Sequence, residues 1–234
     1  MAAARIVGLI VVNVLWAVLV LRRADRRFAA EPLPAGAPVR GSFLEGEPKE
    51  TWDRLLVGLF APAMALGCSF AFDSGWVAAM VSTYLVFCAV VAVRDLRWRI
   101  IPNALVYPAF PLYAGAVVAL WAGGQGVRPF VSLFGMLAYG GGLFLLALLW
   151  QGAMGIGDVK LAGLTGLVLG ALGWAYVAVA AAGAVLLGGI VGVVVLIAGG
   201  RRTKIPFGPY LALGAVLSGF VAPEVARWYL GRLG

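Results

Sequence analysis

The chain has 234 residues and a mean hydropathy of +1.00; 63% of its residues are hydrophobic and only 12% are charged. Soluble domains carry about 25% charged residues, so a water-soluble fold of this length could not bury so much apolar surface. The composition therefore predicts a membrane protein. The net charge of +8 comes from basic residues that flank apolar segments, a pattern that favours a membrane protein over a nucleic-acid-binding one.

Eight apolar segments are each near the length of about 20 residues that crosses a bilayer. The first runs from Ile6 to Leu21, and the polar segment that follows it, residues 22–53, has the composition of a flexible loop. The uncharged stretch 161–200 is long enough for two spans, with a turn between Gly173 and Gly183. We therefore expect an all-α polytopic membrane protein with about eight transmembrane helices. The remaining spans are predicted near residues 55–72, 76–93, 102–121, 129–150 and 205–221.

The basic residues predict the orientation. If the N-terminus lies outside, 14 of the 18 basic residues fall on the cytoplasmic side, as the positive-inside rule requires. The first span lacks a small-residue cleavage site and has its heavier positive flank after the apolar run, so we interpret it as a retained helix and not as a signal peptide.

Missing residue types restrict the chemistry. The chain has no histidine, which excludes Ser-His and Cys-His catalysis and most catalytic zinc sites. The two cysteines, Cys68 and Cys88, lie within apolar runs and form no CxxC pair. They are typical of small buried side chains, and neither a metal site nor a disulfide is predicted.

Two of the ten acidic residues, Asp95 and Asp158, abut apolar spans on the predicted cytoplasmic side. Charges at this depth are costly and usually functional. Two carboxyls that converge in a low-dielectric site share a proton, and such a pair can activate a water molecule and protonate a leaving nitrogen. The alternative is that Asp95 only pairs with a neighbour such as Arg94, and Asp158 with Lys160.

The residues around Asp158 fit a site that a substrate strand approaches. Gly155 and Gly157 precede the acid, and glycine permits close backbone approach and strained angles; the alternative is a flexible turn between two helices. Lys160 either extends to the membrane interface, or favours an ionised carboxylate or binds a substrate carbonyl.

Prolines mark the starts of two spans. Pro102 and Asn103 begin the fourth span, where proline suits the first helical turn, and we expect them to hold Asp95 at a fixed distance from the helix entrance. Pro206 and Pro209 are expected to do the same for the last span, with a place in the substrate groove as the alternative.

Three separated motifs occur in one order along the chain. The first and third are an Asp95…IPN segment that ends at Asn103 and a PFGP segment over 206–209; between them lies a GxGDxKL segment over 155–161. Together they resemble bacterial type IV prepilin peptidases, which are GxGD-type membrane aspartyl proteases, over about residues 94–214. The resemblance implies that Asp95 and Asp158 are catalytic. It places Gly155, Gly157 and Lys160 in the active-site motif and Pro102, Asn103, Pro206, Gly208 and Pro209 in structural motifs near it.

The resemblance also implies a substrate and a location. Such enzymes remove the short, basic class III-type leader of prepilins or pseudopilins at the cytoplasmic face of the bacterial inner membrane, and they need no cofactor for the cleavage. We therefore divide the chain into a first transmembrane helix (1–21), a flexible cytoplasmic loop (22–53) and a transmembrane aspartyl peptidase domain (54–234). Bifunctional family members carry a cysteine-paired insert associated with N-methylation. Because residues 22–53 contain no cysteine, we predict a peptidase without N-methyltransferase activity.

Two other functions are compatible with part of the pattern. Presenilin-like or signal-peptide-peptidase-like intramembrane proteases share the GxGD motif, but Arg94 stands where they usually have a tyrosine. A transporter or scaffold could use the two acids as a proton relay, although that role favours acids nearer the middle of the bilayer.

Overall fold

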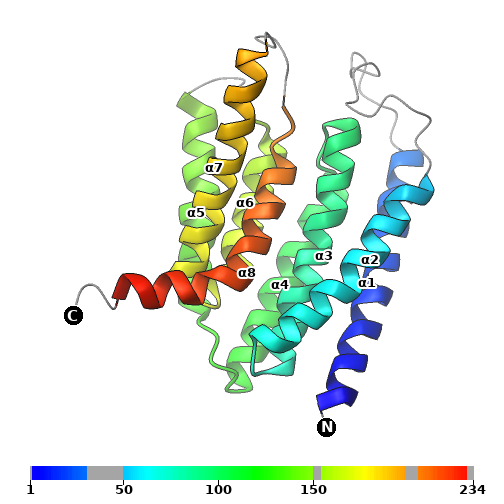
Figure 1. The fold of residues 1–234 in the computed structure, drawn as a ribbon, viewed down its shortest axis with the longest axis vertical. Helices are drawn as coiled ribbons and strands as arrows, with labels where there is room; N and C mark the ends of the chain where they lie inside the picture. Colours follow the sequence, from blue (N-terminus) through cyan, green and yellow to red (C-terminus); the bar gives the residue numbers. More distant parts are fainter. Residues whose placement is uncertain (1, 31–49, 150–153, 199–204, 231–234) are drawn as a thin grey trace.

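The computed structural model describes residues 2–30, 50–149, 154–198 and 205–230. These residues form eight α-helices and include no strand, which confirms the predicted all-α class (Figure 1). The helices are α1 (Ala2–Ala30), α2 (Glu50–Ala71), α3 (Gly75–Trp98), α4 (Asn103–Ala122), α5 (Pro129–Leu149), α6 (Ile156–Gly170), α7 (Trp174–Ile197) and α8 (Gly208–Leu230).

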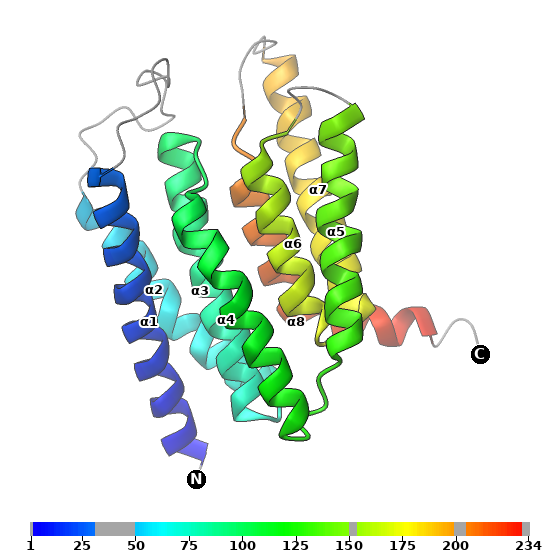
Figure 2. The same ribbon diagram turned by 180° about the vertical axis from the view of Figure 1, so that it is seen from behind.

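Seven of the helices are long and apolar enough to cross a membrane, as a polytopic protein requires. The exception is α6, whose 15 residues extend about 22 Å, less than the roughly 30 Å of a bilayer core. Successive helices nevertheless alternate in direction (Figures 1 and 2), so α6 returns the chain to the end from which α7 starts. The stretch 161–200 thus contains most of α6 and all of α7, and the turn over residues 171–173 comes earlier than predicted, sharing only Gly173 with the predicted window.

The first helix is longer than the predicted span. We expected it to end at Leu21 and a loop to occupy residues 22–53, but α1 continues to Ala30 and α2 already begins at Glu50. Residues 31–49 of the predicted loop lie outside the described part of the chain. The span was predicted too short because charge ends an apolar run without ending a helix, and arginine and alanine are good helix formers.

The helices form two groups, α1–α4 and α5–α8, which occupy the two halves of Figure 1. Across the join, α3 packs against α8 and α4 packs against α6. Within the second group, glycines bring the backbones of α5 and α6 into contact: a Cβ atom on Gly140 would lie 2.8 Å from the Cα atom of Gly163, and one on Gly166 would overlap the carbonyl oxygen of Gly135. Small residues at helix interfaces are typical of membrane bundles.

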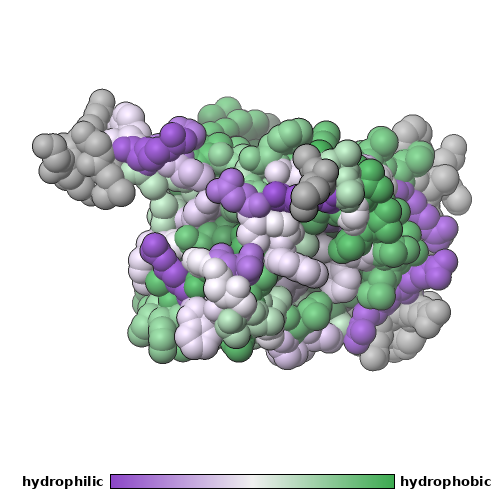
Figure 3. Space-filling model, turned by 90° about the horizontal axis from the view of Figure 1, so that it is seen from below, coloured by the Kyte–Doolittle hydropathy of each residue, from purple (hydrophilic) through white to green (hydrophobic). Residues whose placement is uncertain are grey.

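Much of the outer surface is apolar, as contact with lipid requires. Phe70 is 78% exposed and Ile197 is 80% exposed. Figure 3, which views the bundle from the end where α1 begins, shows hydrophilic residues separated by apolar surface. Polar groups inside the bundle pair with one another across helices: the side-chain amide of Asn13 in α1 donates to the hydroxyl of Ser82 in α3 at 2.9 Å.

Candidate active site

The two candidate acids lie at the same end of the bundle, the upper end in Figures 1 and 2. Asp95 is in the last turn of α3, which runs toward this end, and Asp158 is in the first turn of α6, which starts there. Both are buried, Asp95 at 4% and Asp158 at 8% exposure. The structure therefore places two carboxyl groups from sequence-distant helices at one end and out of bulk solvent.

Asp95 is held by the first residue of α8. Its Oδ2 atom accepts a hydrogen bond from the backbone N–H of Gly208 at 2.9 Å. A Cβ atom on Gly208 would lie 2.7 Å from the same oxygen, so the approach of α8 to Asp95 depends on glycine at this position. The sequence placed Gly208 only in a structural motif near the site; the structure shows that it contacts the acid.

Asp158 is held by its own helix start. Its Oδ2 atom accepts a hydrogen bond from the backbone N–H of Gly155 at 3.1 Å, whereas its Oδ1 atom is buried and has no hydrogen-bond partner among the described residues. Asp158 lies outside the seven apolar spans. Burial, and then the negative charge of Asp95, raise its pKa to about 7 against the opposing effect of the Gly155 N–H. The charge of Asp95 therefore acts on Asp158, and a pKa of about 7 leaves a substantial fraction of the Asp158 carboxyl protonated at neutral pH.

The two glycines of the GxGD motif have different roles. Gly155 precedes α6 with φ −78° and ψ 145°, an ordinary extended conformation, so the strained angles that glycine would permit do not occur there. Gly157 lies against the segment between α3 and α4: a Cβ atom on it would be 2.9 Å from the Cβ atom of Ile101. This contact brings the start of α6 against the chain that follows Asp95.

Lys160 connects α6 to α4. Its Nζ atom donates to the side-chain oxygen of Asn103 at 2.9 Å and lies 4.5 Å from the centroid of the Tyr107 ring. The side chain therefore reaches α4 instead of pairing with Asp158, one of the alternatives that the sequence left open. Pro102 directly precedes α4 with φ −67°, in agreement with its predicted place at the start of that helix.

Pro206 and Pro209 flank the first residue of the last helix. Pro206 lies before α8 and Pro209 lies in its first turn, so both mark a helix start, as predicted. The PFGP segment thereby brings the N–H of Gly208 to Asp95.

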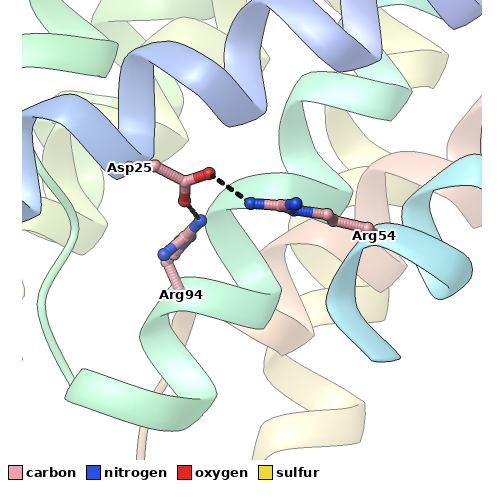
Figure 4. A network of polar contacts seen from close by, with 3 residues as sticks. All are labelled: Asp25, Arg54 and Arg94. Carbon is pink, nitrogen blue, oxygen red and sulfur yellow. Dashed lines mark hydrogen bonds and ion pairs between the residues drawn. The ribbon is translucent and has the colours of Figure 1, made fainter. Parts of the chain in front are cut away.

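The residue before Asp95 faces a different set of helices. Arg94 is buried at 6% exposure and forms an ion pair with Asp25 of α1, whose other carboxylate oxygen lies 3.7 Å from Arg54 of α2 (Figure 4). The guanidinium also lies 4.9 Å from the centroid of the Trp98 ring. Sequence reasoning missed this ion pair because it assigned Asp25 to a flexible loop.

The geometry supports acid–base chemistry by two carboxyl groups. One is oriented by a backbone donor from α8, and the other has a raised pKa and one unpaired oxygen. Among the described residues, no group of three or more histidine, cysteine, aspartate or glutamate side chains could hold a metal ion. Cys68 and Cys88 are buried, as predicted.

Comparison with known proteins identifies a family match over the region that contains both acids. Residues 82–193 match the type IV leader peptidase family. A prepilin leader peptidase/N-methyltransferase of Bacillus subtilis (strain 168) is 29% identical over 147 residues, which cover 60% of this chain and 55% of the relative. Proteins of the same name are 30% identical over 189 residues in Aeromonas hydrophila, covering 75% of this chain and 60% of the relative, and 31% identical over 120 residues in Legionella pneumophila, covering 50% and 34%.

This chain matches only part of the length of each relative. The chain spans 55%, 60% and 34% of the lengths of the three proteins, and their names combine two activities. No solved structure gives a significant match.

Proposed function

Because residues 82–193 match the type IV leader peptidase family, we propose that this chain is a membrane aspartyl endopeptidase. Its substrates are prepilins or pseudopilins, from which it removes the short basic leader. The observation that carries the proposal is the burial of Asp95 and Asp158 at one end of the bundle, each with a backbone N–H donated to its carboxyl group.

In the proposed mechanism the two acids have different roles. The Gly208 N–H stabilises an ionised Asp95, which accepts a proton from a water molecule while the water oxygen attacks the scissile carbonyl carbon. Asp158, whose burial and partly unpaired carboxyl favour protonation, donates its proton to the leaving nitrogen as the peptide bond breaks. One proton enters the pair and one leaves it, so the dyad ends with the proton count it started with.

We further propose that the site faces the cytoplasm of a bacterial inner membrane. Basic residues gather at the end that holds the two acids, including Arg22, Arg54, Arg97 and Lys160 on α1, α2, α3 and α6. Such an excess of basic residues is typical of the cytoplasmic side. A substrate with a basic leader followed by a membrane helix would present its scissile bond at this interface.

A direct test is to co-express a candidate prepilin with the wild type, Asp95→Asn and Asp158→Asn. We expect a mobility shift of leader length with the wild type and none with either variant. Asp73→Asn is a matched control, because this acid lies between α2 and α3 at the opposite end of the bundle, and it should cleave normally. Normal cleavage by either dyad variant would contradict the mechanism. A cut within the membrane helix of the substrate, identified by sequencing the product N-terminus, would favour the presenilin-like alternative.

We propose cleavage without N-methylation, on the basis that residues 22–53 contain no cysteine. The curated relatives carry a name that includes both activities, so N-methylation by this chain is measured directly. Mass spectrometry of the cleaved pilin, after incubation with S-adenosylmethionine, should show an unmodified N-terminus. A product heavier by one methyl group, formed by the purified chain, would refute this part of the proposal.

A further inference from the structure

The last turn of α3 carries two buried charged residues in succession. Arg94 and Asp95 are 6% and 4% exposed, and adjacent side chains on a helix point about 100° apart. The Arg94 guanidinium extends to Asp25 of α1, whereas the Asp95 carboxylate meets the N–H of Gly208 at the start of α8. This turn is therefore held from two directions, on one side by an ion pair and on the other by the proposed active site.

Of the two arginines that Figure 4 shows beside Asp25, Arg94 is the buried one. The Arg94 side chain is 8% exposed and the Asp25 side chain 34%, whereas Arg54, at 3.7 Å from Asp25, is 60% exposed. A buried guanidinium that loses its counter-charge is strongly destabilising, and an exposed pair contributes little. Asp25 therefore acts on Arg94 far more than on Arg54.

Asp25 lies outside the region that matches the peptidase family, residues 82–193. It belongs to the polar end of α1, beyond the apolar part of that helix, and Figure 4 shows its carboxylate between the two arginines. A residue in the first helix thus contacts the turn of α3 that carries Asp95.

We propose that Asp25 is a positioning residue for peptide cleavage. By holding Arg94 against α1, it fixes the rotation of the last turn of α3, and so keeps the Asp95 carboxylate in register with the Gly208 N–H. The inference rests on the proposed function of Asp95 and adds a requirement for the first helix.

The test measures kcat and KM for leader cleavage by the full chain in detergent. Asp25→Asn keeps the size of the side chain but removes its charge. We expect kcat to decrease about 10- to 100-fold, because misplacing a reacting group by about 1 Å can lower a rate by about that much. KM should stay at the wild-type value, because the site for the leader is intact. Asp25→Glu should restore most of the lost kcat. Arg54→Gln is the matched control, since it removes the exposed arginine of the same network, and its kcat should match that of the wild type.

A double-mutant cycle tests whether Asp25 acts through Arg94. Arg94→Met alone, and together with Asp25→Asn, should lower kcat as much as Asp25→Asn does, with no further loss in the double variant. The double variant removes both charges of the buried ion pair and so avoids a buried Arg94 charge without Asp25; it decides the question if Asp25→Asn alone fails to fold.

Several results would overturn the inference. These are wild-type kcat in Asp25→Asn or in the double variant, an effect on KM alone, or an equal loss in Arg54→Gln. Asp95→Asn in the same assay separates this inference from the proposed function: cleavage by that variant would contradict the proposed function itself, whereas its inactivity beside a fully active Asp25→Asn would contradict only the role of Asp25.

Discussion

Replacing Gly208 with alanine tests the link between helix packing and catalysis. The new Cβ atom would lie 2.7 Å from Oδ2 and 3.1 Å from Cγ of Asp95, whereas carbon makes ordinary contacts at about 3.5 Å or more, so the groups must separate by roughly 0.8 Å. The hydrogen bond from the Gly208 N–H would then be stretched or lost. A hydrogen bond to a charged group contributes about 1.5–3 kcal/mol, which corresponds to a loss of about 10- to 150-fold in kcat/KM.

The measurement is the rate of leader removal by purified Gly208→Ala in detergent, with thermal unfolding followed in parallel. Alanine is a better helix former than glycine, which offsets part of the about 1–3 kcal/mol that the steric overlap costs, so we expect a modest fall in the unfolding temperature and compare cleavage rates at a temperature where both proteins are folded. Gly142→Ala in α5 is the matched control, because a Cβ atom there meets nothing within 4 Å. Wild-type cleavage by Gly208→Ala, or an equal loss in Gly142→Ala, would refute the argument that this contact orients Asp95.

Two further predictions concern the helices around the site. Lys160→Met removes the contact of α6 with Asn103 and Tyr107. We expect that contact to position the first turn of α6, so kcat/KM should fall about tenfold. Asn103→Ala should cause the same loss, and the double variant should lose no more than either single variant. Additive losses in cleavage kinetics would show that Lys160 acts elsewhere. Gly166→Ala places a methyl group against the carbonyl of Gly135 and should lower the free energy of unfolding in detergent by about 1–3 kcal/mol. Gly141→Ala is the control, because the Cβ position there faces open space, and its stability should not change. Equal stability of the two variants would contradict the close packing of α5 and α6.

The spans were predictable because lipid requires every backbone group to be hydrogen-bonded within the chain, which makes apolar runs helical. Hydropathy located seven of the helices for this reason. It misjudged the ends of helices that continue into water, as α1 does to Ala30, because polarity there changes without a change of backbone conformation. It also gave no sign that α6 is only 15 residues long, since the apolar stretch 161–200 joins α6 to α7 without a charged residue.

The candidate acids could be found from sequence because few acidic residues of this chain lie beside apolar spans, and two motifs marked them. The residues that contact the Asp95 segment could not be found from the sequence. The contact of Gly208 with Asp95 and the ion pair between Asp25 and Arg94 join residues that are far apart in the chain, so they depend on how the helices pack and not on any local pattern. Lys160 likewise had two plausible environments in the sequence, and only the position of α4 shows that it reaches Asn103.

The short length of α6 explains how Asp158 can be buried at the end of a helix. In Figure 2, α6 begins lower than the upper ends of α5 and α7, so its first turn, which carries Asp158, is recessed between longer helices. Eleven of the 15 residues of α6 are buried, and glycines let this helix approach α5 until the two backbones touch at Gly140 and Gly163. Glycine costs about 1 kcal/mol relative to alanine in a helix exposed to water. In this bundle the same residue permits the close packing that holds a short helix, and with it the carboxyl group of Asp158, in a fixed place.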